Sequence, residues 1–273
     1  MRLNRRYKIL IIFVLNIILT SISGCSGFKY LTASFKSTSD FNKSDTNPDV
    51  RFRGNNKQYA NHVGIFTPKI IAIVEDKIGV KFLKMPIIFI CDTWSCIKEF
   101  TGHNYKPRAS TNKRGIFISP KLIGDLQTTE FLMPHEVTHA LWADKVNSMF
   151  HPIPPAWFTE GIATFIANGA GAEKVPREKA KESIIKGKYF IPNSDGKIMS
   201  AKYGGAWGLE QPMFYRQSML MIEYMRTISH DNFNNLVKDV FSKQVKFSDL
   251  FYKYYSTTPS ALWLEYVAKV RGA

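Results

Sequence analysis

The most informative stretch of this sequence is HEVTH, at residues 135–139. Glu160, in WFTEGIATF (157–165), follows it downstream. Together they predict two helices that meet at a metal-binding site. His135 and His139 are four residues apart, so on a helix they lie on one face, close enough to hold one metal ion. Glu136 sits one position round the helix, where it can act on a water molecule instead of serving as a ligand. Glu160 adds a carboxylate near the start of a second expected helix.

Two histidines and one glutamate are a common ligand set of hydrolytic zinc sites, which keep a fourth position for water. The sequence therefore predicts one Zn²⁺ per chain, held by His135, His139 and Glu160. Zinc lowers the pKa of its water and polarises a carbonyl group, and Glu136 is expected to take the proton of that water as general base. An amphipathic helix that merely carries two histidines is the alternative for the pentapeptide, and the second motif disfavours it.

These motifs resemble those of the gluzincin metallopeptidases, the thermolysin-like clan, and within it the compact peptidase-MA-like domains. HEVTHALW (135–142), with Pro134 directly before it, is similar to their first zinc helix, and PPAWFTEGIATFIA (154–167) is similar to their second. The resemblance extends loosely over residues 58–270. It implies a zincin-like α+β fold, in which a small mixed sheet packs on the HExxH helix and a mainly helical C-terminal lobe follows. It also implies a zinc metallopeptidase with a peptide or protein substrate.

The N-terminus predicts the location of the protein. Residues 2–8 contain four basic side chains, residues 9–19 are apolar except for Asn16, and Ile22-Ser23-Gly24-Cys25 follows. This order is typical of a bacterial lipoprotein signal, and the apolar run is too short to span a bilayer. We expect residues 1–24 to be removed and Cys25 to carry the acyl chains, palmitate among them, that anchor the protein in the cell envelope. The outer membrane is expected if the host has two membranes, and a plain secretory signal is the alternative.

The composition of the remaining chain predicts a tether followed by one folded domain. Residues 25–57 are rich in Ser, Asn, Asp, Thr, Lys and Gly, which predicts a flexible lipid-anchored tether. The metallopeptidase domain is then expected over residues 58–273. The formal net charge of the whole chain is +15, which could suit acidic partners. The lysines are spread along the chain and no nucleic-acid motif accompanies them, so no nucleic-acid partner is expected.

Hydrophobic periodicity predicts the elements around the zinc motifs. A helix is expected to open at Thr67-Pro68 and to end at Gly79, and Pro134 indicates either a kink or a new helix start. By the resemblance, the strand at 115–119 would be the edge strand of the cleft, along which an extended substrate pairs its backbone. The other expected elements are a strand at 86–91 and helices at 173–187, at 214–225, at 233–241 and from Pro259 onward.

The remaining cysteines and histidines leave alternatives open. Cys91 and Cys96 could form a disulfide in an oxidising envelope, but a continuous helix between them would hold their Cα atoms too far apart, so free thiols are equally expected. His151 could line the cleft from the loop between the two zinc helices. Thr164 could donate a hydrogen bond to the metal ligands or simply pack. The isolated histidines His62, His103 and His230 are expected to be surface or satisfied core residues.

A tyrosine is expected to assist the zinc ion. In aminopeptidase-like gluzincins, which this layout resembles, a tyrosine from a helix start downstream of the third ligand donates a hydrogen bond to the oxyanion of the transition state. Tyr215, in the first turn after Pro212, matches that position, and Tyr203 is a rival. Residues 105–122 contain no acid to bind a free α-amine, so an endopeptidase is favoured over an aminopeptidase.

Three functions therefore compete. The first is an envelope zinc endopeptidase, and the second is a zinc-binding lipoprotein of the same fold with a binding or envelope-assembly role and little or no turnover. The third is a lipoprotein without a metal, such as an adhesin. The full ligand set together with Glu136 favours the first.

Overall fold

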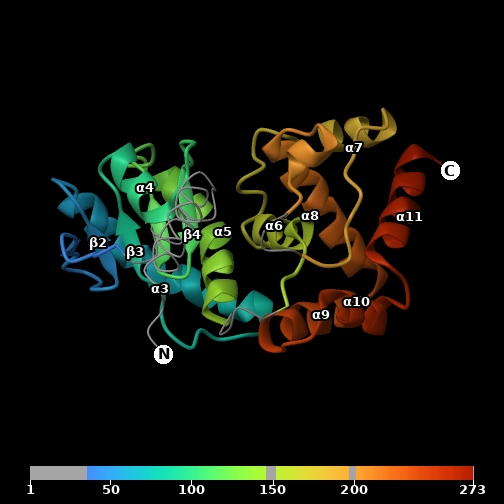
Figure 1. Cartoon of the computed structure of the whole chain (residues 1–273), viewed down its shortest axis with the longest axis horizontal. Coiled ribbons are helices and arrows are strands. Elements are labelled where there is room, and N and C mark those ends of the chain that lie inside the picture. The colour runs from blue at the N-terminus through green and yellow to red at the C-terminus, as the bar shows by residue number, and fades with distance from the viewer. Residues whose placement is uncertain (1–35, 146–151, 197–200, 273) are drawn as a thin grey trace, which may run out of the picture.

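The computed structural model describes residues 36–145, 152–196 and 201–272. It is an α+β fold with a sheet half and a helical half, as Figure 1 shows. The strands are β1 (Asn42–Lys43), β2 (Val50–Phe52), β3 (Ile88–Ile90), β4 (Ala109–Asn112) and β5 (Gly115–Ile118). The α-helices are α3 (Lys57–Ile78), α4 (Trp94–Thr101), α5 (Leu126–Lys145), α6 (Ala156–Ile166), α7 (Arg177–Ile185), α8 (Gln211–Ile228), α9 (His230–Ser242), α10 (Phe247–Tyr255) and α11 (Pro259–Arg271), and a 3₁₀ helix covers Gly204–Trp207. Within these ranges, no helix combines the length and apolar character needed to cross a membrane.

The sheet is mixed, as expected, and its order is β1-β2-β3-β5-β4. Strands β2, β3 and β5 are parallel to one another, while β1 and β4 are antiparallel to their neighbours. Side chains alternate across it, as strand geometry requires. Ile88 and Ile116 belong to the main core, which also contains residues of α3 and α5. Phe89 and Phe117 stack at 4.8 Å on the other face, in a smaller core with Phe100 of α4.

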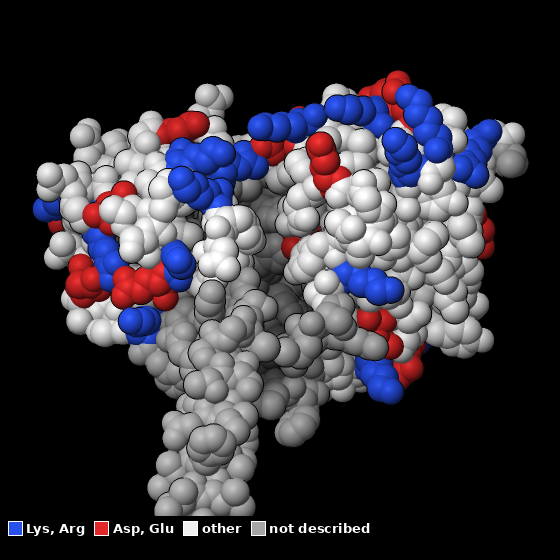
Figure 2. Space-filling model, turned by 45° about the horizontal axis from the view of Figure 1, so that its top comes forward, with Lys and Arg blue, Asp and Glu red and all other residues white. Residues whose placement is uncertain are grey.

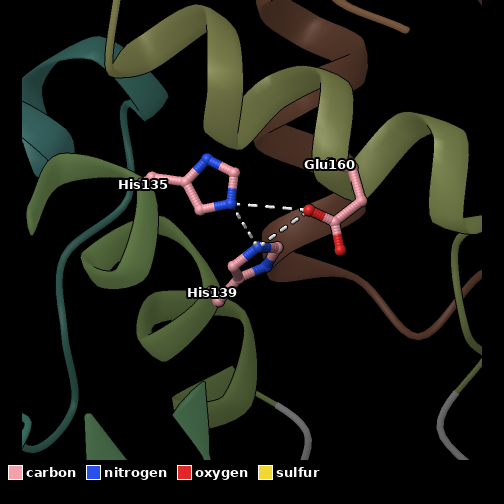
Figure 3. A group of neighbouring side chains, drawn as sticks. All are labelled: His135, His139 and Glu160. Atoms are coloured by element: carbon pink, nitrogen blue, oxygen red, sulfur yellow. Dashed lines mark hydrogen bonds and ion pairs between the residues drawn. The ribbon is translucent and has the colours of Figure 1, made fainter. Parts of the chain in front are cut away.

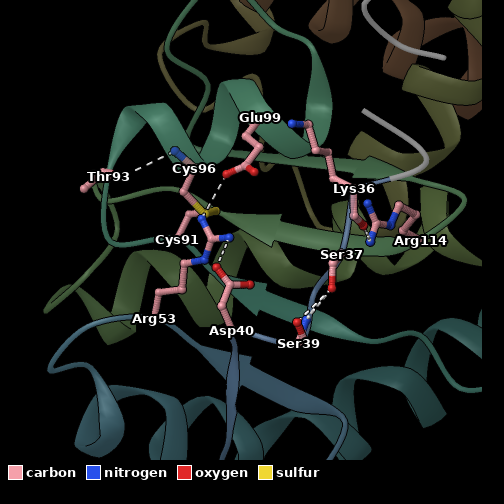
Figure 4. Close-up of polar contacts among 10 residues, drawn as sticks. All are labelled: Lys36, Ser37, Ser39, Asp40, Arg53, Cys91, Thr93, Cys96, Glu99 and Arg114. Atoms are coloured by element: carbon pink, nitrogen blue, oxygen red, sulfur yellow. Dashed lines mark hydrogen bonds and ion pairs between the residues drawn. A yellow bond between two sulfur atoms is a disulfide. The ribbon is translucent and has the colours of Figure 1, made fainter. Parts of the chain in front are cut away.

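The tether predicted for residues 25–57 is wrong for its second part. Residues 42–43 and 50–52 form β1 and β2, and the side chains of Phe41, Val50 and Phe52 are buried. The guanidinium group of Arg53 lies over the rings of Phe41 and Phe100, at 4.6 and 4.8 Å. It also pairs with the carboxylates of Asp40 and Glu99 (Figure 4). The polar composition is misleading because these few apolar side chains are enough to attach the segment to the sheet. Residues 1–35, including the proposed signal and Cys25, lie outside the described residues.

Cys91 and Cys96 form a disulfide, with their Cα atoms 5.5 Å apart (Figure 4). That separation is usual for such a bond. It is reached because helix α4 begins only at Trp94, so the chain between the cysteines is not one continuous helix. The hydroxyl of Thr93 caps the helix by accepting from the Cys96 N–H, at 3.2 Å. The bond therefore joins the end of β3 to α4.

Both helices with an interior proline differ from the expectation. Helix α3 begins at Lys57, ten residues before the predicted start, and continues through Pro68 to end at Gly79. Helix α5 runs from Leu126 to Lys145 through Pro134, so of the two alternatives at Pro134 a new helix start is excluded. In each case buried side chains continue along one face on both sides of the proline, and this tertiary packing outweighs the loss of one hydrogen bond.

The helical half follows the predicted order with small shifts. Helix α7 begins at Arg177, after Pro176, and is shorter than the predicted 173–187. Helices α9 and α11 cover the predicted segments, and Ser229 and Thr258 cap their first turns. Apolar side chains from α6 and from α8 to α11 join those of α3 and α5 in one core. The two halves are therefore packed as one unit around α5 and α6.

We predict that a chain beginning at residue 58 is far less stable than one beginning at residue 36. The shorter chain lacks Phe41, Val50 and Phe52, whose burial should contribute roughly 5 kcal/mol together, a large part of the stability of an ordinary domain. Thermal unfolding followed by circular dichroism should show a midpoint lower by at least about 10 °C, or no cooperative transition. Equal midpoints would mean that residues 36–57 are a dispensable tether.

Candidate metal centre and cleft

Helices α5 and α6 bring the three predicted ligands together. The Nε2 atom of His135 lies 3.2 Å from Nε2 of His139 and 3.4 Å from Oε2 of Glu160, and Nε2 of His139 lies 3.3 Å from the same oxygen. Figure 3 shows the two rings turned toward the carboxylate from adjacent helices. His135 and Glu160 are buried and His139 is partly exposed. This group could hold a metal ion.

The spacing of these atoms matches a tetrahedral metal site. Ligand bonds of about 2.0 to 2.1 Å place neighbouring tetrahedral ligands about 3.3 Å apart, and the three distances are 3.2, 3.4 and 3.3 Å. Oε2 of Glu160 is buried without a hydrogen bond that satisfies it among the described residues. Lone pairs that converge in this way repel one another unless a cation or protons lie between them. The donor set therefore fits a divalent ion.

The electrostatics keep Glu160 charged. Burial by itself would raise the pKa of Glu160, but the imidazoles of His139 and His135, at 3.3 and 3.4 Å from its Oε2, outweigh it and hold that pKa far below its ordinary value. Burial would likewise lower the pKa of His139, but Glu160 and Glu136 outweigh it, so the pKa of this imidazole is raised. An ionised carboxylate is the form that binds a metal ion.

Glu136 points to the sheet side of the cleft. Its Oε2 accepts a hydrogen bond from the Thr111 hydroxyl, at 2.6 Å. Thr111 belongs to β4, which is the edge strand of the sheet, whereas β5 is paired on both sides. The prediction that 115–119 forms the edge of the cleft is therefore wrong. Strand β4 takes that place because the hairpin at Lys113 and Arg114 folds it back over β5, next to α5.

Tyr215 lies beside the ligands, as predicted. It is in the first turn of α8, which begins at Gln211, and its ring centroid is 5.6 Å from that of His135. Burial raises the pKa of Tyr215 well above its ordinary value, and the carboxylate of Glu160 raises it further. The phenol therefore keeps its proton at neutral pH and can donate a hydrogen bond. Tyr203 also lines the cleft and is more exposed.

Two glycines permit this packing. A Cβ atom on Gly161, directly after Glu160, would lie 2.9 Å from the Ser218 carbonyl oxygen, so only glycine lets α8 approach α6 this closely. Gly171 has a φ of +89°, and a Cβ there would lie 3.1 Å from the ring of Tyr215 and 3.2 Å from the ring of His135. The chain after α6 therefore closes directly over the first ligand.

The three candidate ligands line a cleft of about 760 Å³ between the sheet half and the helical half. Figure 2 shows this hollow, with Lys and Arg side chains gathered at its rim. Arg108, just before β4, lines the cleft and pairs across it with Glu173 of the chain after α6, at 2.5 Å. Among the described residues that line the cleft, the only carboxylates are those of Glu136 and Glu160.

Several residues of the cleft differ from what their sequence context indicates. His103 was expected to be a surface or satisfied core residue, and its Nε2 does lie 2.8 Å from the Ser110 hydroxyl, but the residue also lines the cleft, where burial lowers its pKa. The hydroxyl of Thr164 is buried without a hydrogen-bond partner in the described part of the chain, so of the two alternatives for this residue the structure favours packing. His151 lies outside the described residues. Thr111 was missed because ASTN (109–112) lacks the apolar alternation that indicates a strand.

Comparison with known proteins adds no relative. No protein-family model matches this sequence, and no curated protein matches it.

Proposed function

We propose that this protein is a zinc-dependent metallopeptidase of the gluzincin type, carried on a bacterial lipoprotein. The observation that supports it most is the convergence of His135, His139 and Glu160 at tetrahedral spacing, with Glu136 beside them in an open cleft. Nitrogen and carboxylate ligands at this spacing suit Zn²⁺. When bound, zinc supplies a Lewis acid that polarises a carbonyl group and makes a water molecule more acidic.

The protein side chains have distinct roles in the proposed hydrolysis. Glu136 accepts the proton of the attacking water and passes it to the leaving amine. The Thr111 hydroxyl fixes one oxygen of the Glu136 carboxylate, at 2.6 Å, and so orients the base toward the reacting atoms. Tyr215 donates its phenolic proton in a hydrogen bond to the oxyanion that forms as the carbonyl is attacked.

The cleft suits an extended peptide. Strand β4 pairs with β5 on one side only, and residues 107–111 line the cleft on its other side. Main-chain groups of an edge strand can pair with a peptide added as a further strand. Apart from Glu136 and Glu160, no carboxylate lines the described cleft to bind a free α-amine. These features support an endopeptidase in preference to an aminopeptidase.

The proposed site of action is the bacterial cell envelope, on the side that faces away from the cytoplasm. Its support is the order of basic, apolar and Ile-Ser-Gly-Cys segments before Cys25. The Cys91–Cys96 disulfide agrees with an oxidising compartment, where such bonds persist. A lipid on Cys25 would attach the peptidase domain to the membrane, in the outer membrane if the host has two.

We predict that the zinc-loaded protein cleaves blocked peptides internally and that two variants separate metal binding from chemistry. His139→Ala should lose zinc, because two remaining ligands hold it poorly, and activity should disappear with it. Glu136→Gln should keep one zinc per chain and lose at least about 99% of kcat, because an amide cannot accept the proton. Metal content by atomic emission and cleavage by mass spectrometry measure both effects.

The outcomes of these variants are distinct. Unchanged zinc content in the His139→Ala variant would remove the site assignment. Full activity in Glu136→Gln would exclude the general-base role. A zinc-loaded wild-type protein that cleaves no peptide in a broad peptide library would favour the binding or assembly role instead.

We predict that Tyr215→Phe lowers kcat by roughly 10- to 1000-fold, because it removes only the hydroxyl that stabilises the oxyanion. Zinc content and unfolding temperature should not change. Tyr203→Phe is the matched control, since Tyr203 lines the same cleft but is more exposed. If the Tyr203 variant loses activity and the Tyr215 variant does not, the two tyrosines must exchange roles.

We predict that Cys25→Ser abolishes acylation and releases the protein from the membrane fraction, because the side chain that carries the lipid is gone. Intact-mass measurement and detergent partition of wild type and variant test it. Cys96→Ser is the control, since it replaces a cysteine of the folded domain, breaks only the Cys91–Cys96 disulfide and should leave acylation unchanged. An acylated, membrane-bound Cys25→Ser protein would disprove the lipoprotein assignment.

A further inference from the structure

A second cavity, of about 590 Å³, lies beside helix α6 and is bounded by α8, α9 and the end of α3. Ile162, Phe165 and Ile166 of α6 line it, whereas Glu160 of the same helix faces the cleft. At 100° per residue these three positions are turned well away from Glu160 on the helix. The second cavity is therefore separate from the proposed zinc site.

The charges that line this cavity are unbalanced. Lys77, Arg177, Arg216 and Arg226 face it, together with one carboxylate, that of Glu223. Glu223 forms a bidentate pair with Arg177. In the described part of the chain, no carboxylate lies within 4.0 Å of the charged nitrogens of Lys77, Arg216 or Arg226. Three cationic groups thus share a cavity whose one carboxylate is paired with a fourth, Arg177.

Arg216 is the buried member of this group, with 8% of its surface exposed. Its Nε donates to the Val175 carbonyl at 2.8 Å and its Nη2 to the Ala172 carbonyl at 3.1 Å. Carbonyl oxygens satisfy hydrogen bonds but do not neutralise a charge, and a buried charge without a counter-ion is costly. Burial and the neighbouring Arg177 lower the pKa of Arg216 more than Glu223 and Glu173 raise it. An anion in the cavity would offset this cost.

Arg226 and Lys77 line the same cavity from exposed positions, and each contacts a residue of its wall. The guanidinium group of Arg226 lies 5.8 Å from the ring centroid of Phe165 and its Nη2 is 3.1 Å from Nε2 of His230. Nζ of Lys77 donates to the Ile166 carbonyl at 2.9 Å. Guanidinium groups bind phosphate and carboxylate oxygens through paired hydrogen bonds. The apolar lining beside them can receive a non-polar part of the same ligand.

We propose that this cavity is a binding site for an oxyanion, a phosphate or carboxylate group, carried on a small apolar body. Arg216 and Arg226 bind the oxygens, and Lys77 adds a third positive charge. Phe165, Met219 and Phe233 contact the apolar part. The site is independent of zinc and of peptide hydrolysis, because none of its ligand-binding groups belongs to the cleft.

Isothermal titration of the full-length protein in detergent with phenyl phosphate tests the proposal. The double variant Lys77→Gln/Arg226→Gln should bind at least roughly tenfold more weakly than wild type, because two charge-assisted contacts are lost. Lys69→Gln/Lys238→Gln is the matched control, since it removes two exposed charges from the same protein outside the cavity and should bind as wild type does. Benzoate in place of phenyl phosphate shows which head group is preferred.

Circular dichroism shows whether the Lys77→Gln/Arg226→Gln variant folds. If it does not, a third variant still tests the proposal. Glu223→Gln removes the one carboxylate of the cavity and should tighten phenyl phosphate binding several-fold, roughly, because the repulsion of the anion is removed. Three results would overturn the proposal: no binding of phenyl phosphate or benzoate, equal losses in the cavity and control variants, or phenol binding as tightly as phenyl phosphate. Unchanged or weaker binding by Glu223→Gln would do the same.

Discussion

The buried carboxylate of Glu160 is the group on which the arrangement of the two halves depends. A charge in the interior needs compensation, and the groups that face this one are the imidazoles of His135 and His139 on the neighbouring helix. Helices α5 and α6 must therefore pack so that His135 and His139 lie opposite Glu160. Gly161 then allows α8 to lie close against α6 and to bring Tyr215 to the same point. The charge of Glu160 thus relates α5 to α6, and the small size of Gly161 lets α8 join them.

Much of the site could be predicted from the sequence because its signals are local. The i, i+4 spacing of His135 and His139 needs only a helix, and the apolar face of α9 needs only its own periodicity. The outcome at Cys91 and Cys96 depended on where α4 begins, which a hydrophobic pattern does not specify to within a residue. For the same reason the start of α3 was misplaced by ten residues. Interior prolines were given too much weight because tertiary packing can override a local break.

The residues whose roles the sequence does not predict make contacts between segments that are far apart in the chain. Thr111 contacts Glu136 because a hairpin places β4 at the sheet edge, and β4 is polar because one of its sides faces the open cleft. Arg108 pairs with Glu173, which comes from the other half of the molecule. Phe41 is one apolar side chain in a polar segment, and its importance appears only once the rings of Phe89 and Phe100 are placed around it. No periodic signal within a short window encodes such contacts.

The early start of the folded domain has a consequence for which molecules the cleft can reach. Phe41 is already fixed in the core, so only about 16 residues separate it from Cys25, and a fully extended chain of that length spans at most roughly 55 Å. The average span of a flexible chain of that length is nearer 20 to 24 Å, roughly. With a lipid on Cys25, as proposed, the cleft would stay within a layer next to the membrane surface that is about one or two protein diameters deep. A substrate that is itself fixed in the membrane would have to expose its peptide within that layer, whereas soluble molecules would reach the cleft by their own diffusion.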